Sequence, residues 1–319
     1  MTVNDSHCHF FSTAFFSALG RALPDRSDRS RSAAEADVAI DRASDEALAR
    51  LGWEAPGTAE QLADRWVREL DHRRVSRAAL IASVPGDAES VAVAVARHPT
   101  RLVGFFMVDP TLPDAHVPAA DAIDRGRLTA ICLFPAMHRF SLHDERVKTL
   151  FDVAAARPGT AVFVHCGVLS VGARTRLGLP SPFDIRFGNP LDLHALASSH
   201  PSVPIIVPHF GAGLFREALM LADLCRNVML DTSSSNGWTK YHAPPLALAD
   251  VFRQALAVAG PDRLLFGSDS SFFPRGWVVD VMERQTAALD QIGAGDEVKA
   301  KIFGGNFDRT FPLTGAVCS

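Results

Sequence analysis

The chain has 319 residues, 47% of them hydrophobic, so it can bury a large core either as one α/β barrel or as two domains of ordinary size. Its formal net charge of -4 excludes the strongly basic surface that nucleic-acid binding requires. No apolar run approaches the roughly 20 residues needed to cross a bilayer, and the N-terminus lacks the basic and then apolar order of a signal peptide. We therefore expect a cytoplasmic protein without nucleic-acid or membrane partners.

Short apolar runs alternate with segments of helical pattern along nearly the whole chain, which predicts parallel strands joined by crossover helices. Eight strands are expected, over residues 2–9, 77–84, 102–108, 128–134, 161–165, 204–209, 228–232 and 264–269. Helices are expected over residues 58–72, 87–98, 144–157, 190–200, 213–225, 245–259, 278–292 and 296–303. This rhythm in a chain of this length is typical of an α/β protein with the closed (β/α)8 TIM barrel fold.

Residues 12–57 interrupt this rhythm. The segment is polar and charged, and it is too long for a plain connection between a strand and a helix. A disordered loop and a lid over the mouth of the barrel are both open, the second because the segment follows the first strand. No linker or repeat divides the chain, so residues 1–319 are expected to form a single domain.

The first strand carries His7-Cys8-His9. In an extended segment, residues two apart project from the same face, so both imidazoles point together while Cys8 points away. Two such side chains suit a shared metal ion, although an isolated His-x-His pattern is a weak signal.

Further polar residues stand at the ends of later predicted strands. His165 ends the fifth strand, His209 ends the sixth and Asp269 ends the eighth. A lone histidine or aspartate there is more often a core or turn residue. In a barrel, however, all strands open at their C-terminal ends onto one face, so these side chains should surround one point with His7 and His9. The joint pattern predicts a metal site.

These motifs resemble the amidohydrolase superfamily. The chain is most similar to its amidohydrolase-2 branch, which includes aminocarboxymuconate-semialdehyde decarboxylase and many metal-dependent hydrolases. The residues that carry the resemblance are Asp5-Ser-His7-Cys-His9, His165-Cys-Gly, Pro208-His209-Phe-Gly, Gly267-Ser-Asp269 and the closing segment from Ile302 to Arg309. It implies that His7, His9, His165 and Asp269 bind a metal, and that His209 and Asp269 move protons in catalysis.

One divalent ion is expected, because the fourth strand lacks the lysine that bridges two metals in binuclear members of the superfamily. Imidazole and carboxylate ligands favour Zn²⁺, with Mn²⁺, Co²⁺ and Fe²⁺ as alternatives. The corresponding strand offers Cys132 instead, and whether this thiol contacts the metal or packs in the barrel stays open.

The loop after Asp269 contains Arg275 and Trp277, which we expect to bind substrate. An arginine fork suits a carboxylate, so a small anionic substrate is expected. The predicted activity is hydrolysis of an amide, ester or lactone by metal-activated water. The alternatives are non-oxidative decarboxylation of an unsaturated or aromatic carboxylic acid, by a carboxy-lyase, and a non-catalytic barrel that acts as a binding protein. Substrate identity and oligomeric state are open, with a homodimer as one candidate.

Overall fold

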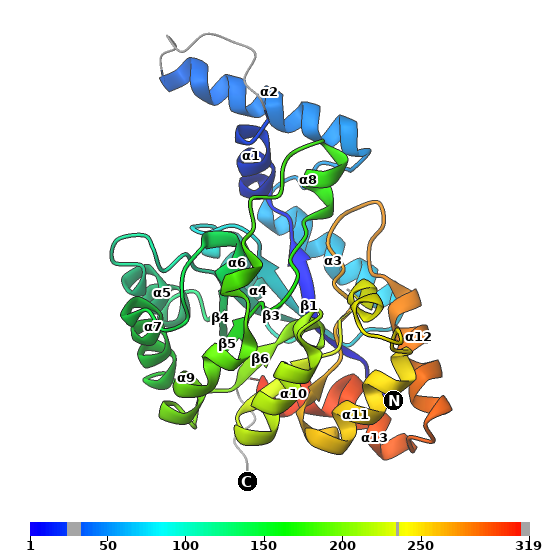
Figure 1. The fold of residues 1–319 in the computed structure, drawn as a ribbon. Helices are drawn as coiled ribbons and strands as arrows, with labels where there is room; N and C mark the ends of the chain where they lie inside the picture. Colours follow the sequence, from blue (N-terminus) through cyan, green and yellow to red (C-terminus); the bar gives the residue numbers. More distant parts are fainter. Residues whose placement is uncertain (24–32, 234–235, 314–319) are drawn as a thin grey trace.

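Eight parallel strands form one sheet in which each strand pairs with the next along the chain (Figure 1). The computed structural model describes residues 1–23, 33–233 and 236–313. The strands are β1 (Asn4–Phe10), β2 (Arg77–Ala82), β3 (Leu102–Met107), β4 (Ala130–Leu133), β5 (Ala161–Val164), β6 (Ile205–Val207), β7 (Val228–Asp231) and β8 (Leu264–Leu265). Because both faces of a barrel strand are covered, the strands read as nearly continuous apolar runs, and almost all of their residues are buried.

Hydrogen bonds between β1 and the chain after β8 bring the two ends of the sheet together. Ser6 N–H donates to the carbonyl of Phe266 over 2.8 Å, and His9 N–H donates to that of Ser270 over 2.7 Å. Cys8 and Ser270 form a parallel bridge. This closure confirms the predicted TIM barrel.

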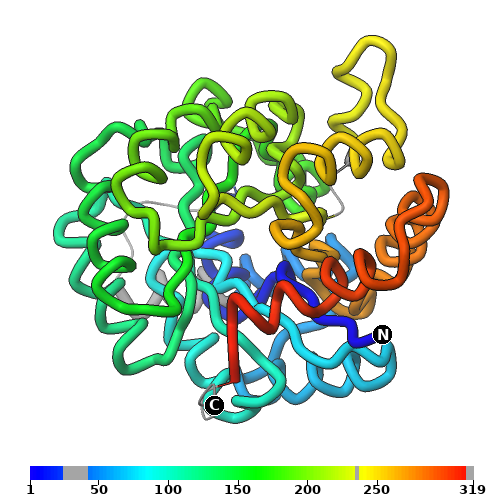
Figure 2. The backbone as a smooth tube through the Cα atoms, turned by 90° about the horizontal axis from the view of Figure 1, so that it is seen from below, coloured from blue at the N-terminus to red at the C-terminus, as the bar shows by residue number. Residues whose placement is uncertain are grey.

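Helices surround the strands (Figures 1 and 2). They are α3 (Ala59–Arg73), α4 (Ala88–Arg97), α5 (His116–Asp124), α6 (Pro135–His138), α7 (Glu145–Ala155), α8 (Gly172–Arg176), α9 (His194–Ser199), α10 (Phe215–Leu224), α11 (Leu248–Val258), α12 (Val279–Gln291), α13 (Asp296–Ala300) and α14 (Asn306–Thr310). Shorter turns are η1 (Ile185–Phe187), η2 (Pro190–Leu193), η3 (Pro208–Gly211), η4 (Asn236–Tyr241), η5 (Pro261–Arg263) and η6 (Lys301–Gly305). Among the described residues, no helix combines the length and apolar character needed to cross a membrane.

All eight predicted strands are confirmed, and so are the predicted helices, apart from their ends. Helix α5, between β3 and β4, was not predicted from the sequence. This helix buries only Ala119 and contains Pro118 in its first turn, so it lacks the repeating apolar positions by which an amphipathic helix is recognised.

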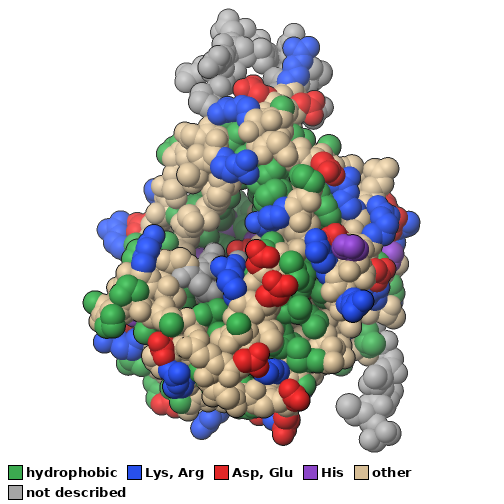
Figure 3. Space-filling view, turned by 90° about the vertical axis from the view of Figure 1, so that its right-hand side faces the viewer, with side chains coloured by type: hydrophobic (Ala, Val, Ile, Leu, Met, Phe, Trp, Pro, Cys, Tyr) green, Lys and Arg blue, Asp and Glu red, His purple; other side chains and the backbone are tan. Residues whose placement is uncertain are grey.

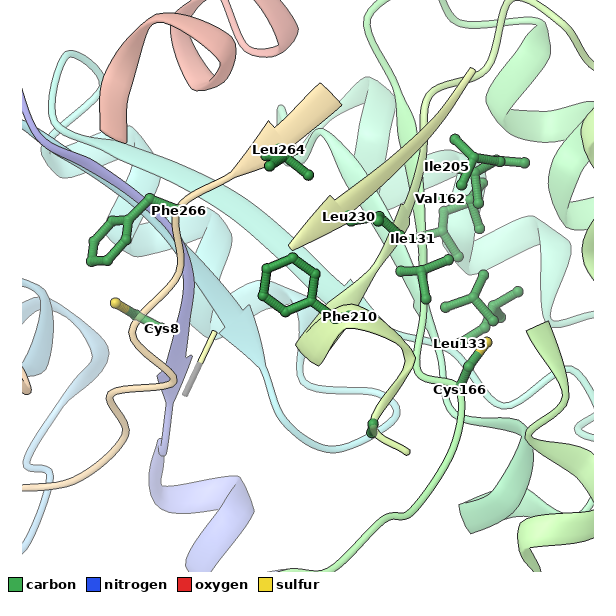
Figure 4. Packing of buried hydrophobic residues seen from close by; sticks show 14 of the residues in the cluster. Cys8, Ile131, Leu133, Val162, Cys166, Ile205, Phe210, Leu230, Leu264 and Phe266 are labelled. Atoms are coloured by element: carbon green, nitrogen blue, oxygen red, sulfur yellow. The ribbon is translucent and has the colours of Figure 1, made fainter. Parts of the chain in front are cut away.

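Two separate apolar layers hold the barrel. The larger layer fills the space between the strands and the surrounding helices, and Figure 4 shows part of it, with Ile131, Val162 and Ile205 from the neighbouring strands β4, β5 and β6. The smaller layer fills the inside of the barrel with side chains such as Phe105, Phe163 and Leu265. The polar site therefore rests on a packed floor.

The segment after β1 contains two helices, α1 (Thr13–Arg21) and α2 (Ala33–Leu51), which project above the barrel (Figure 1). Its described part is thus largely helical rather than a plain loop. Ser12 accepts a hydrogen bond from Phe15 N–H as the cap of α1, and its hydroxyl donates to Asp87 over 2.5 Å.

The projecting helices share a small core with the loop that follows β5. The core contains Phe15 and Leu19 of α1, Leu48 of α2, and Ala173 and Leu177 of that loop. Two arginines add reciprocal bonds across the contact: the Arg50 guanidinium donates to the carbonyl of Leu177 over 2.8 Å, and that of Arg176 donates to Leu51 over 3.1 Å. The two excursions therefore form one packed unit.

Candidate metal centre and active site

Strand β1 presents His7 and His9 on one face and Cys8 on the other. The ring of His7 packs edge-on against Phe163 of β5, with ring centroids 5.1 Å apart, inside the barrel. Cys8 is fully buried in the layer between strands and helices, 3.8 Å from the hydroxyl of Ser268. Alternation along the strand thus gives the two imidazoles a common side.

Asp269, which follows β8, meets these two histidines. Its backbone is left-handed, with φ of 58°, and its N–H donates to the carbonyl of His7 over 2.9 Å. Its Oδ1 lies 3.2 Å from Nε2 of His9 and 3.7 Å from Nε2 of His7. The three side chains can offer ligand atoms that all lie within 4.8 Å of one another. Two imidazole nitrogens and a carboxylate oxygen this close together fit one divalent ion.

The other ring nitrogens of both histidines have partners. Nδ1 of His7 lies 2.7 Å from Oδ2 of Asp231. Nδ1 of His9 lies 2.8 Å from the hydroxyl of Ser83, and that hydroxyl donates to the carbonyl of Ile81, so the histidine is the donor. These contacts hold a hydrogen on each Nδ1, so Nε2 of both rings, which faces Asp269, is the atom that a metal would bind. Such outer contacts fix the orientation of metal-binding histidines in general.

His165 and His209 lie beside this three-residue cluster, at the ends of β5 and β6. The ring of His209 is 5.0 Å from that of His7 and 5.3 Å from that of His165, between ring centroids. His165 stacks against Phe134, and its Nδ1 has no partner among the described residues. The structure therefore brings all four histidines and Asp269 to one end of the barrel, with His7, His9 and Asp269 in the tightest group.

The electrostatics of the cluster suit a cation. Burial opposes ionisation of Asp269, but a hydrogen bond from His9 and the nearby His7 and His209 outweigh it and hold the pKa of the carboxyl well below its usual range. Burial lowers the pKa of His9 and His209, and lowers that of His165 further. An ionised carboxylate beside neutral imidazoles is the donor set that zinc prefers.

His7 differs from the other three histidines. Burial disfavours its charged form, but Asp231 and, less strongly, Asp269 outweigh this and raise its pKa to about 9. Without a metal, the ring therefore carries a hydrogen on both nitrogens and a positive charge at neutral pH. A metal that binds Nε2 has to displace that proton.

Asp231 and Ser233 are site residues that the sequence analysis missed. Both are fully buried, Asp231 as the last residue of β7 and Ser233 two residues after it, and Ser233 Oγ lies 3.0 Å from Nδ1 of His7. A signal was available: β7 ends in aspartate, as the eighth predicted strand does, and reading every strand end in the same way would have included Asp231.

Trp277, expected to bind substrate, is only 1% exposed. Its indole N–H donates to Oδ2 of Asp5 over 2.6 Å, while Oδ1 of Asp5 accepts the N–H of His7 and of Ser268 over 2.9 and 3.1 Å. Burial raises the pKa of Asp5, although these hydrogen bonds oppose the shift. Trp277 thus supports the join between β1 and the chain after β8, and its ring lacks the exposed surface that substrate contact needs.

Arg275, the other expected substrate contact, is exposed beside the cluster. Its guanidinium lies over the ring of Phe272 at 4.5 Å and donates to the hydroxyl of Ser271 over 2.9 Å. A longer contact of 3.4 Å reaches the carbonyl of Asp269. The cation is therefore held beside Asp269.

Cys132 is fully buried in the layer inside the barrel, together with Met107, Phe134 and Phe163. Burial raises the pKa of its thiol well above the usual range. A thiol that stays protonated is a poor metal ligand, so these surroundings favour the packing role over the ligand role.

Stacked aromatic side chains from three segments form a group that reaches His9 through Phe11. Phe11 follows β1 and stacks on Phe15 of α1 at 3.8 Å, while its ring lies 5.5 Å from that of His9. Trp53, after α2, stacks on Phe272 at 3.9 Å. Figure 3 shows a hollow with hydrophobic walls below the projecting helices, and basic and acidic side chains interspersed over the rest of that face. The aromatic group makes one side of the site apolar.

A cavity of about 410 Å³ lies elsewhere, at the N-terminal ends of β2 and β3. Its lining includes Arg77, Leu102, Arg127 and Phe311 and none of the cluster residues. In barrel enzymes, chemistry takes place at the opposite end, where the histidines lie.

An eight-stranded barrel with converging histidines and an aspartate at the C-terminal ends of its strands defines a (β/α)8-barrel enzyme of the metal-binding kind. The family model described as Amidohydrolase matches residues 4–313. The chain therefore belongs to the amidohydrolase family, which confirms the resemblance seen in its motifs. No curated protein matches the chain.

Solved structures with the same fold have low sequence identity to the chain. A 5-carboxyvanillate decarboxylase of Novosphingobium aromaticivorans, with bound manganese and 3-methoxy-4-hydroxy-5-nitrobenzoic acid, is 14% identical, with a TM-score of 0.63 and coverage of 98% of this chain and 97% of that chain. An amidohydrolase of Burkholderia multivorans with bound zinc is 15% identical, with a TM-score of 0.56 and coverage of 98% and 100%. A protein of Acinetobacter baumannii, described as a probable 2-pyrone-4,6-dicarboxylic acid hydrolase with bound citric acid, has 15% identity, a TM-score of 0.56 and coverage of 98% and 99%.

Proposed function

We propose that the protein is a metal-dependent hydrolase that uses activated water on a small anionic substrate with an amide, ester or lactone bond. One observation carries the proposal: Nε2 of His7 and of His9 converge on Oδ1 of Asp269, while Asp231 and Ser83 occupy their Nδ1 atoms. That arrangement holds the ligand atoms before a metal arrives.

His7, His9, His165 and Asp269 would hold one divalent ion, with zinc as the first candidate and manganese, cobalt or iron as alternatives. A bound ion would polarise a carbonyl group and lower the pKa of a water molecule towards about 7. His209 and Asp269 would transfer protons, since both lie beside this point. The packed apolar layer under the cluster limits the entry of water from below.

Arg275 would bind the anionic group of the substrate. Its guanidinium is exposed next to Asp269, where it can form a two-pronged contact with a carboxylate. Two of the similar proteins were solved with carboxylic acids, a nitrobenzoic acid and citric acid. Both are consistent with a carboxylate substrate here.

Metal content and turnover test the proposal together. The purified protein should bind about one equivalent of zinc, manganese or cobalt, and a screen of lactones, esters and amides of carboxylic acids should reveal turnover. His7→Ala and Asp269→Asn should reduce turnover to background while the chain stays folded. His116→Ala, in an exposed position at the start of α5, is the matched control and should change neither property. A folded protein that takes up none of these metals would refute the proposal.

A carboxy-lyase that removes carbon dioxide from an unsaturated or aromatic acid is the second candidate. It is favoured by the aromatic group around Phe11 and Trp53, which offers flat apolar surfaces beside the cluster. Product analysis separates the two activities, because only the carboxy-lyase releases carbon dioxide. A protein that binds metal and carboxylates but turns over neither kind of substrate would instead be the non-catalytic binding barrel.

A further inference from the structure

Ser233 lies between two histidine rings of the site. Its Oγ is 3.0 Å from Nδ1 of His7 and 2.8 Å from Nδ1 of His209. The residue is fully buried, so no bulk water competes for these contacts. A hydroxyl has one hydrogen to donate, and only one of the two rings can receive it.

The neighbouring contacts decide which ring accepts this hydrogen. Nδ1 of His7 faces Oδ2 of Asp231 at 2.7 Å, and a carboxylate can only accept. His7 therefore carries its hydrogen on Nδ1, as it must when Nε2 binds a metal. That nitrogen has no lone pair left for Ser233, whereas Nδ1 of His209 can accept.

We propose that Ser233 donates its hydroxyl hydrogen to Nδ1 of His209 and so holds the neutral ring in the tautomer with hydrogen on Nε2. This inference rests on the proposed function, because it takes His7 as a metal ligand through Nε2. Ser233 is then a positioning residue that acts through His209. It gives the two groups different roles: Nε2 of His209 offers a hydrogen bond to a developing negative charge, and the carboxylate of Asp269 is left as the proton acceptor.

Surrounding bonds fix the serine in this place. Its own N–H donates to Oδ1 of Asp231 over 2.6 Å. The preceding Thr232 exchanges two hydrogen bonds of 2.7 Å with the side chain of Gln285 on α12. Gly267 packs closely against Ser233, since a Cβ added to this glycine would lie only 2.9 Å from Cβ of Ser233. The hydroxyl is thus held by backbone, side-chain and packing contacts at once.

The other tautomer of His209, with its hydrogen on Nδ1, also has an acceptor nearby. The backbone carbonyl of Ser233 lies 3.4 Å from Nδ1 of His209, and it can accept a hydrogen only if that nitrogen carries one. Removing the hydroxyl should therefore let the ring move its hydrogen to Nδ1 and bond this carbonyl. Nε2, which has no hydrogen-bond partner among the described residues, would then lose its hydrogen.

Nitrogen-15 NMR of the zinc-loaded protein, labelled at histidine, tests this assignment without a substrate. The signals of His209 are identified by their loss in His209→Gln. We expect a bare Nδ1 and a protonated Nε2 in the unchanged protein, the reverse in Ser233→Ala, and restoration in Ser233→Thr, which keeps the hydroxyl. Ser199→Ala is the matched control, because Ser199 contacts Nδ1 of His200 at 3.0 Å outside the site, so only His200 should respond.

Turnover gives a second readout. Ser233→Ala should lower kcat about 100-fold, the usual effect of losing one donor to a developing negative charge, with KM changed little and zinc content unchanged. A protonated Nδ1 on His209 in the zinc-loaded protein would overturn the inference and leave the proposed function intact. Failure of the folded protein to bind zinc, manganese or cobalt would refute the proposed function itself.

Discussion

Replacing Asp231 by asparagine should weaken zinc binding about 10- to 100-fold. The carboxylate uses both oxygens: Oδ2 accepts from Nδ1 of His7 over 2.7 Å, and Oδ1 accepts from the N–H of Ser233 over 2.6 Å. An asparagine has one oxygen and one NH₂ group, so in either orientation one donor faces another donor. If the NH₂ faces His7, the ring moves its hydrogen to Nε2, the atom that must bind the metal.

The size of the effect follows from the bond that is lost. A buried hydrogen bond to a charged group contributes about 1.5–3 kcal/mol. At about 1.4 kcal/mol for each factor of ten, this amounts to about 10- to 100-fold in the dissociation constant. Asparagine keeps the shape of aspartate, so packing around the fully buried residue should not change.

Competition with a chromogenic chelator measures the zinc dissociation constant directly. Asp223→Asn, at an exposed position on α10, is the matched control and should bind zinc as the unchanged protein does. Circular dichroism verifies that both variants are folded. A folded Asp231→Asn protein whose zinc affinity lies within about threefold of the control would refute the argument that Asp231 orients His7.

Three further predictions follow from the cluster and its supports. Because Asp231 raises the pKa of metal-free His7 to about 9, zinc binding at pH 7 should release a proton from this ring. The zinc affinity should therefore rise about tenfold for each pH unit up to pH 9, as the proton on His7 competes less and less with the metal. Trp277→Phe should lower the free energy of unfolding by about 1–3 kcal/mol, because it leaves Oδ2 of buried Asp5 without its donor. Gly267→Ala should lower it by about 1–3 kcal/mol and weaken zinc binding, since the added Cβ would lie 2.7 Å from Oδ1 of Asp231 and 2.9 Å from Cβ of His7.

Each of these predictions has a matched measurement. Calorimetry in two buffers of different ionisation enthalpy counts the released protons, and pH-independent zinc affinity between pH 6 and 8 would contradict the first. Urea unfolding of Trp66→Phe is the control for the second, because Trp66 is fully buried but its indole N–H has no hydrogen-bond partner in the described part of the chain. Gly295→Ala controls the third, as no atom of the residues that the structure describes lies within 4 Å of its added Cβ. If a control variant loses as much free energy of unfolding as the variant it is paired with, the argument for Trp277 or for Gly267, respectively, is contradicted.

The barrel could be predicted because its strands are buried on both faces and therefore appear as apolar runs between helical segments. Their ends then indicated where His165, His209 and Asp269 meet His7 and His9 in space. Individual strand bounds were less certain, since β8 has only two ladder residues and Asp269 lies beyond it in a left-handed turn.

The supporting residues could not be predicted in the same way. Asp231 is followed by Thr-Ser, a combination as common in turns as in sites, and its role appears only when the barrel closes and β7 lies two strands from β1. Trp277 looked like a substrate contact because it follows Asp269 closely, but the chain turns it inward onto Asp5. Sequence distance does not show which way such a side chain points.

The shared core of α1, α2 and the loop after β5 has a consequence for protein engineering. Because Phe15, Leu48 and Leu177 bury one another, and Arg50 and Arg176 bond across the contact, a foreign version of either segment would meet a mismatched neighbour. To give this barrel the substrate range of a related one, residues 12–57 and 168–187 should therefore be exchanged together. Exchanging one segment alone would expose apolar surface, and the resulting protein should aggregate.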